Sequence, residues 1–524
     1  MKNKIIENNI LIIFSSLFFS ILVQLISLPQ SINHDLSSYL SPAVALLENY
    51  GLPYKDYFDI KPPLSIFFLY VWIFFFGYSL YSLAILNFVL LTIFFYCFYK
   101  ILLKISKTIY SYYIFFFSIT ISITSSHFEM FLSTEIIGNF FIFLSIYLFF
   151  YFKDTQIKWF IIGLLCFIAG QIKEVYFFCI IAFIILSFYK KLNSKKLFTQ
   201  LILGWSSGLF LTIFLLYQNN ILSDYIGVIY FKKQIFNVKF ISYAYHLIKT
   251  FWSFALHLNI FFLFFCFFIF KIYLINKKRI LVNIVKNYLI EEKSLFLLII
   301  LSLMLVGFTW QFKVPYDHYF LSIWFFFILV FYSLIAKVYS NFKIGYSFTL
   351  NNFLACLMIT ISVIINIIIF EKSEFYKISK NIDLFSKNFK HEFYQKDRFK
   401  KIKSLLDDDS CVQSIYGWNS GSLHIYSGKP PCSKFFLSNL VINEKTEKIY
   451  RKELLMKPPK IVVYVDVDEN TINKEQFEYK VFPWQKIITK CYYEIENINT
   501  YYLSKFSQNE MKNCFNNLLI ENKI

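Results

Sequence analysis

The sequence predicts a polytopic α-helical membrane protein that carries a small α/β domain at its C-terminal end. Of its 524 residues, 57% are hydrophobic and 16% are charged, and the apolar residues gather in runs that approach the roughly 20 residues needed to cross a bilayer core. From Glu371 onward the composition changes to Lys, Asp, Glu and Asn, with short β-like runs. This break predicts a membrane domain at 1–370 and a second domain at 371–524.

The first apolar run is predicted to be an uncleaved membrane helix, because no small-residue cleavage site ends it and further runs follow. A shorter run from Leu64 to Gly77 would invert every later loop if it crossed the membrane. We expect it to lie along the external interface or to enter and leave on one side. About eleven spans of bilayer length are then expected. They lie near 9–29, 79–99, 109–126, 136–152, 159–172, 175–189, 198–217, 250–275, 294–310, 320–339 and 346–370.

Lysine-rich loops alternate along the chain with loops that are poor in lysine. This bias predicts the orientation of the chain in the membrane. If the Lys-rich loops and the N-terminus are cytoplasmic, the loops at 30–63, 127–135, 173–174, 218–249 and 311–319 are external, and so is the tail. The predicted location is the bacterial inner membrane. Much of the excess lysine behind the net charge of +19 lies in these short loops, where it sets the orientation. The charge is therefore poor evidence for nucleic-acid binding, and no nucleic-acid partner is expected.

The tail contains a predicted strand, IVVYVDV at Ile461–Val467, after a Pro-rich loop. The nine cysteines include no C-x-x-C pair, which argues against a zinc ribbon or a thioredoxin-like centre. Outside the cytoplasm the four tail cysteines can form disulfides. We expect one between Cys411 and Cys432, while the pairing of Cys491 and Cys514 stays open.

The sequence GWSSG at 204–208 matches the G-x-S-x-G pattern of a nucleophile elbow, which requires a strand–turn–helix context. Here it lies inside an apolar helical run. We therefore predict that its small residues allow close packing between helices.

The predicted external loops carry the ionisable residues with which a membrane enzyme would work, because charge at the bilayer centre is expensive. The alternative is that these loops are simply polar. The residues concerned are Asp35, Asp56, Asp59, Lys61, His127, Glu129, Glu135, Lys173, Glu174, Lys313, Asp317 and His318.

The first loop reads HDLSSYLSPAVALLENYGLPYKDYFDIKPPL. An acidic residue soon after the first span, followed by A-x-x-L-L-x-x-x-G-x-P-Y-x-D and K-P-P-L, resembles the polyprenyl-phosphate-dependent glycosyltransferases of the type C (GT-C) superfamily. The similarity is greatest to aminoarabinose transferases, protein mannosyltransferases and related bacterial enzymes. Weaker similarities are STE at 133–135, GLLCFIAGQIKE at 163–174, DHYFLSIWFFF at 317–327 and the tail element YGWNSGSLHIYSGKPPCSKF.

The resemblance implies a GT-C fold and a sugar donor linked to a polyprenyl phosphate. The acceptor would be a hydroxyl on a glycan, lipid or protein outside the membrane. Asp35 matches the family's catalytic acid-loop position and would act as general base. Lys61 matches a cation that would stabilise the leaving phosphate, and the two prolines after it would stiffen its loop. A single displacement would invert the anomeric centre.

Glu135 matches a second acidic position, which would orient a partner of Asp35, bind the sugar or help to hold a divalent cation. Lys173 is either a second phosphate contact or an interface lysine. Donor or substrate contacts are also assigned to Tyr54 and Asp56, and to His318 and Tyr319, for which anchoring of a helix end is the alternative. The position after Asp35 is often acidic in protein mannosyltransferases and here is Leu36, which favours the bacterial glycolipid and glycan transferases. No D-x-D pair lies near Asp35, so a metal-dependent oligosaccharyltransferase scheme is less supported.

Two other functions fit parts of the pattern. Polymerases and ligases of the O-antigen type also have many spans, but their largest external loop is usually internal and Arg-bearing. Transporters for lipids or sugars tend to have paired halves and ionisable residues at the midplane. Acidic residues are nearly absent from the predicted spans here.

The topology can be tested with a reporter that is active only in the cytoplasm, fused after Ile524. We expect no signal, because the loop charges place the tail on the opposite side. A strong cytoplasmic signal would overturn the orientation and, with it, the external site.

Overall fold

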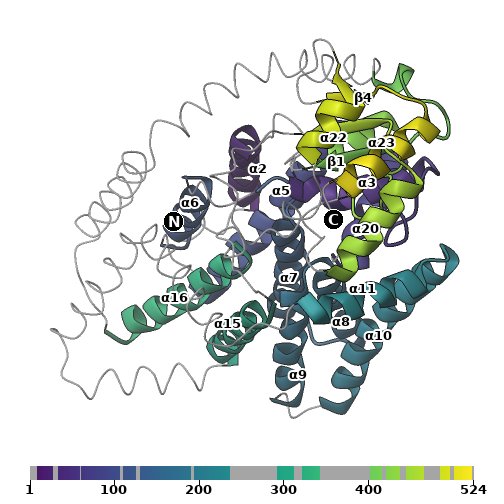
Figure 1. The fold of residues 1–524 in the computed structure, drawn as a ribbon. Coiled ribbons are helices and arrows are strands. Elements are labelled where there is room, and N and C mark those ends of the chain that lie inside the picture. Colours follow the sequence, from purple (N-terminus) through teal and green to yellow (C-terminus); the bar gives the residue numbers. More distant parts are fainter. Residues whose placement is uncertain are drawn as a thin grey trace. The chain divides into compact units, whose positions relative to one another are not determined.

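The structure is a computed structural model. It describes residues 9–27, 34–59, 61–106, 110–124, 130–189, 194–235, 292–311, 321–342, 402–415, 420–436, 444–464, 484–495 and 501–521. Its contacts divide the chain into two compact units. Unit 1 contains 1–28, 83–211 and 238–383, and unit 2 contains 29–82, 212–237 and 384–524. Figure 1 labels the helices and strands.

Unit 1 is helical where it is described, and its helices coincide with the expected apolar runs. They are α2 (Asn9–Ser27), α5 (Leu80–Ile105), α6 (Tyr110–Thr124), α7 (Thr134–Tyr151), α8 (Gln156–Ile172), η1 (Glu174–Phe178), α9 (Cys179–Tyr189), most of α10 (Ser194–Gln218), α15 (Glu292–Gln311) and α16 (Leu321–Phe342). The expected span at 175–189 begins as the 3₁₀ turn η1 and becomes α-helical only at Cys179. The expected spans at 250–275 and 346–370 lie outside the described residues.

By length and composition, three of the described helices are long and apolar enough to cross a membrane. They are Leu80–Ile105, Thr134–Tyr151 and Lys195–Gln218. The other apolar helices are shorter, so the number of spans stays a prediction. Large apolar side chains point outward from several of them; Phe14 of α2 and Phe210 of α10 are 71% and 73% exposed. Apolar surface of this extent is typical of contact with lipid.

Helix α7 is buried along most of its length and is capped at both ends. Ser133 accepts a hydrogen bond from the N–H of Ile136 and caps the N-terminus. At the other end the buried ammonium of Lys158 donates to the carbonyls of Phe149 and Phe152. Lys158 also forms an ion pair with Asp154 at 2.7 Å. A cation at this position complements the negative end of the helix dipole.

Helices α8 and α10 cross at two glycines. A Cβ atom on Gly204 would lie 1.9 Å from the carbonyl oxygen of Phe160, and one on Gly163 would lie 2.0 Å from that of Leu201. The backbones therefore meet with no room for a side chain. The prediction that GWSSG is a helix-packing element is confirmed, since residues 204–208 lie within α10.

Unit 2 joins the first loop to the tail. The first loop is half helical, because α3 (His34–Leu47) precedes its turn and α4 (Pro63–Phe76) follows it. Helix α3 packs against α4 and against α19 (Ser420–Ser427) of the tail. The remaining helices of this unit are α11 (Leu222–Ile235), α20 (Glu444–Met456), α22 (Trp484–Cys491) and α23 (Gln508–Glu521).

The tail contains a four-stranded sheet in the order β1-β2-β4-β3. Strand β1 (Val412–Ile415) runs parallel to β2 (Ile461–Tyr464), and β4 (Tyr501–Ser504) is antiparallel to both β2 and β3 (Tyr492–Glu494). The predicted strand at Ile461 is therefore confirmed over its described part. So is the predicted Cys411–Cys432 disulfide, and a second bond joins Cys491 to Cys514.

The close approach of α8 and α10 predicts that Gly204→Ala lowers the melting temperature of the detergent-solubilised protein, because the added methyl group must push two backbones apart. Gly227→Ala in α11 is the matched control, since a Cβ there meets nothing within 4 Å. In a helix this control should be neutral or stabilising by about 1 kcal/mol. Equal melting temperatures for the two variants would contradict the packing role.

Candidate functional site

The turn of the first loop, from Gly51 to Lys61, is held by hydrogen bonds of its own. The side chain of Asp56 accepts from the N–H of Leu52 at 2.8 Å, and the N–H of Tyr54 donates to the carbonyl of Tyr57 at 2.8 Å. Tyr54 has a φ of 64°, in the left-handed region that bulky residues rarely adopt. A buried tyrosine held in this conformation indicates that the surrounding contacts determine the shape of the turn.

Tyr54 and Asp59 hold the backbone of Lys61 from two sides. The hydroxyl of Tyr54 donates to the carbonyl of Lys61 at 3.0 Å, and Asp59 Oδ1 accepts from the N–H of Lys61 at 3.2 Å. Asp59 is buried. Burial raises the pKa of Tyr54 well above its usual value, so its hydroxyl keeps the proton that it donates.

The Lys61 side chain lies over an aromatic ring. Its Nζ atom is 4.6 Å from the centre of the Tyr39 ring in α3, within the range of a cation–π interaction. Pro62 and Pro63 follow at the start of α4, and Ser65 donates its hydroxyl to the Pro62 carbonyl at 2.6 Å. The lysine is thus fixed where a turn meets a helix, with its side chain half-buried.

A second pair of predicted site residues meets in unit 1. Lys173 Nζ lies 2.6 Å from Glu135 Oε1, and the two side chains are only 12% and 3% exposed. Thr134 donates its hydroxyl to the other oxygen of Glu135 at 3.2 Å. Glu135 lies in the first turn of α7, and Lys173 is the residue that ends α8. The tight turn after α8 therefore places the Lys173 ammonium next to the first turn of α7.

Tyr176 fixes the backbone next to this ion pair. Its hydroxyl lies 2.9 Å from the carbonyl of Glu135 and 2.9 Å from Asn139 Oδ1. Asn139 in turn donates to the carbonyl of Leu321, at the start of α16. A Cβ on Gly138 would lie 2.0 Å from the Tyr176 ring, so the ring packs directly against the backbone of α7.

The approach to α7 is fixed from α5 by Asn87. Its side chain accepts from the N–H of Leu132 at 2.9 Å and donates to Gln24 at 2.7 Å. Asn87 is fully buried, and Leu132 has a φ of 48°. This contact holds the short segment that leads to Ser133 and Glu135.

The other predicted site residues are placed less completely. Asp35 is the second residue of α3. His318 and Tyr319 lie outside the described residues, as do His127 and Glu129. Within the described part of the chain, no three His, Cys, Asp or Glu side chains gather as they would around a metal ion.

Sequence reasoning missed two residues and one contact that shape these sites. It gave no role to Tyr39, to Tyr176 or to the contact between Asp59 and the Lys61 backbone. The spacing of Asp59 from Lys61 was the one available signal, because a short acidic side chain often accepts from a backbone N–H two residues later. Tyr39 and Tyr176 reach their sites through tertiary packing and carry no such local signal.

The chain has limited similarity to known proteins. No protein-family model matches the chain, and no curated protein matches it. The solved structure of the Archaeoglobus fulgidus oligosaccharyltransferase, in complex with zinc and sulfate, is similar at 11% sequence identity and a TM-score of 0.45. The similarity covers 86% of this chain and 67% of that one.

The Glu135–Lys173 pair yields a stability prediction. Removing one partner of a buried ion pair leaves the other charge unpaired and costs about 3–5 kcal/mol, whereas replacing both costs less. Lys173→Met should therefore lower the melting temperature of the solubilised protein strongly. Lys173→Met combined with Glu135→Gln should recover part of that loss. A double variant as unstable as the sum of its single variants would show that the two side chains are not coupled.

Proposed function

We propose that this chain is an integral-membrane glycosyltransferase that moves a sugar from a polyprenyl-phosphate donor to an acceptor hydroxyl on the extracytoplasmic face. The acceptor class is an envelope glycan, lipid or protein. The proposal rests first on the sequence resemblance of the first loop, HDLSSYLSPAVALLENYGLPYKDYFDIKPPL, to GT-C enzymes. The apolar helices of span length agree with a membrane location.

The structural observation that best supports this proposal is the fixed position of Lys61. Its backbone is held on both sides, by Asp59 and Tyr54, and two prolines follow it. A cation that must stabilise a leaving phosphate is effective only if it is held in place before the reaction. A lysine on a merely polar surface loop would not need two side chains to fix its backbone.

The proposed reaction is a single displacement. The acceptor oxygen attacks the anomeric carbon while Asp35 takes the proton of the acceptor hydroxyl. The bond between the anomeric carbon and the phosphate oxygen breaks, and the polyprenyl phosphate leaves with the electron pair. Lys61 stabilises the negative charge that develops on the phosphate. Attack from the face opposite the leaving group inverts the anomeric centre.

Glu135 is proposed to bind the sugar, and for Lys173 the resemblance implies a second phosphate contact, with an interface lysine as the alternative. Because the two side chains already form an ion pair, Lys173 would have to exchange this carboxylate for a phosphate to act as a second phosphate contact. A Glu135 carboxylate that is oriented by Lys173 and Thr134 is suited to accept hydrogen bonds from sugar hydroxyls. Glu135→Gln is expected to impair transfer without abolishing folding.

The roles of Asp35 and Lys61 can be separated in a transfer assay with purified, solubilised protein and a polyprenyl-phosphate sugar. Asp35→Asn should lower turnover by roughly 10²–10⁴-fold and leave donor binding intact, because only the base is lost. Lys61→Ala should weaken donor binding and turnover together. Lys55→Ala is the matched control, since Lys55 is an exposed lysine of the same turn.

Near wild-type transfer by Asp35→Asn would show that Asp35 is not the base. If Lys61→Ala and Lys55→Ala behave alike, K-P-P serves only as a stiff lead into α4, and the proposed phosphate contact is wrong.

A further inference from the structure

We propose that the tail segment PPCSKFF (430–436) positions Lys61 in the first loop, so that the Cys411–Cys432 disulfide acts on donor binding through this segment. This inference rests on the proposed function of Lys61. The segment lies far from Lys61 in sequence, and both belong to unit 2. We call it the 430–436 segment.

The 430–436 segment contacts the first loop directly. The N–H of Phe58 donates to the carbonyl of Lys434 at 2.8 Å. The ring of Phe58 packs against that of Phe435, and the ring of Tyr57 packs against that of Phe436, each with centroids 5.1 Å apart. Two aromatic contacts and one backbone hydrogen bond therefore join the two stretches of chain.

These contacts lie next to the residues that hold Lys61. Phe58 precedes Asp59, and Asp59 accepts the N–H of Lys61. Tyr57 also supplies the carbonyl that accepts from Tyr54, which in turn donates to the carbonyl of Lys61. The 430–436 segment therefore contacts Tyr57, which holds Tyr54, and Phe58, which precedes Asp59. Through these two residues it reaches both of the side chains that bond to the Lys61 backbone.

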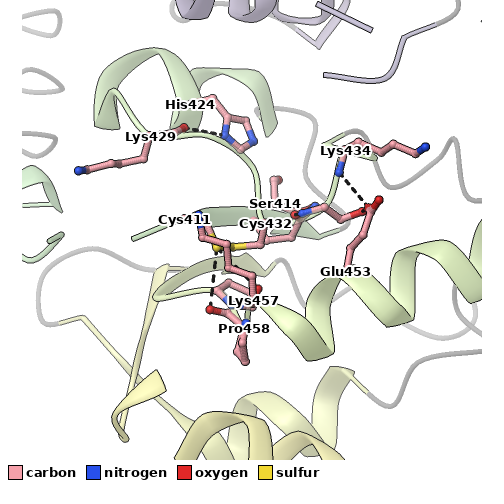
Figure 2. The surroundings of a disulfide bond; sticks show 12 residues. Cys411, Ser414, His424, Lys429, Cys432, Lys434, Glu453, Lys457 and Pro458 are labelled. Atoms are coloured by element: carbon pink, nitrogen blue, oxygen red, sulfur yellow. Dashed lines mark hydrogen bonds between the residues drawn. A yellow bond between two sulfur atoms is a disulfide. The ribbon is translucent and has the colours of Figure 1, made fainter. Parts of the chain in front are cut away.

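The segment itself is fastened to the tail at two points, which Figure 2 shows. The disulfide bonds Cys432 to Cys411, at the start of β1, and the N–H of Cys432 donates to the carbonyl of Val412 at 3.2 Å. Glu453 of α20 accepts from the hydroxyl of Ser433 at 2.7 Å and from the N–H of Lys434 at 3.2 Å. The Lys434 residue that holds Phe58 is therefore itself held by Glu453.

A second contact between loop and tail is made at His424, which Figure 2 shows bonded to the Lys429 carbonyl in the surroundings of the disulfide. The hydroxyl of Tyr50 donates to the carbonyl of His424 at 3.0 Å, and the ring of Tyr57 meets the His424 ring edge-on at 5.6 Å. Burial lowers the pKa of His424 to about 4, with a hydrogen bond to the Lys429 carbonyl acting against this shift. The loop therefore packs on a neutral ring at physiological pH.

The disulfide could instead stabilise the tail in general, and the second disulfide separates these cases. Cys491–Cys514 joins α22 to α23 in the same domain and closes a loop of similar length, with a sequence separation of 23 against 21. It does not include the 430–436 segment. The two bonds should therefore contribute similarly to the entropy of the unfolded tail and differently to Lys61.

The test compares Cys411→Ser/Cys432→Ser with Cys491→Ser/Cys514→Ser in the full-length solubilised protein. Hydrogen exchange at the amides of Phe58 and Lys61 is the first readout, and it needs no activity. We expect exchange there to be faster by roughly tenfold or more in the first variant, because local opening is easier, and unchanged in the second. Equal exchange in the two variants would overturn the proposal, whatever the chain transfers.

The second readout is the coupling to Lys61 in the transfer assay. Loss of Cys411–Cys432 should raise the KM for the donor and lower kcat/KM, but should add little in a Lys61→Ala background, because the same interaction is then already lost. Loss of Cys491–Cys514 should have the same effect in both backgrounds. Additive effects of the Cys411–Cys432 loss and Lys61→Ala would refute positioning while leaving the proposed function standing.

Glu453 provides a variant that keeps both disulfides. Glu453→Ala removes the acceptor for Ser433 and Lys434 and should reproduce the faster exchange at Phe58. Glu453→Gln retains an acceptor oxygen and should restore most of the protection. Glu447→Ala is the matched control on the same helix, because Glu447 pairs with Arg451 at 2.7 Å. Fast exchange after Glu447→Ala alone would assign the effect to α20 as a whole and overturn the role of the segment.

Discussion

The structure depends on one constraint, which is that polar groups of an apolar chain must find partners within the protein. In the helices of unit 1, serine hydroxyls donate hydrogen bonds to the carbonyl four residues earlier. Ser16 donates to Ile12 in this way, and Ser145 donates to Phe141. Lys158 satisfies the carbonyl end of α7 in the same way. Polar side chains that are bonded in this way have defined partners, and this makes their positions precise.

The two lysines of the candidate sites meet this constraint differently. Lys173 is 12% exposed and paired with Glu135, so its charge is largely balanced within unit 1. Lys61 is half-buried beside the ring of Tyr39, and the side chains of Tyr54 and Asp59 hold its backbone by hydrogen bonds. A cation–π contact attracts the ammonium without neutralising its charge. Lys173 is thus held by pairing of its charge, whereas Lys61 is held through its backbone and by an aromatic ring.

Much of the fold could be predicted from the sequence because its signals are local. Apolar runs located the described helices of unit 1, and the Pro-rich loop before Ile461 located β2. The expected bond between Cys411 and Cys432 is also present. Glu135 and Lys173 lie, as expected, at the ends of the apolar runs near 136–152 and 159–172. Their pairing was not predicted, because it depends on how α7 and α8 pack. The packing of the first loop on the tail was missed for the same reason, since nothing near Phe58 indicates Lys434.

The contacts between loop and tail have a consequence for the order of folding. Tyr50 and His424, which form one of them, are 374 residues apart, and contacts of such separation form late because a long loop must be closed first. The first loop is synthesised early, but the 430–436 segment follows only when the tail is made. On the predicted topology, that segment is fastened by a disulfide in an oxidising compartment. The backbone of Lys61 would then be fully held only after the tail has crossed the membrane and Cys411 has bonded to Cys432.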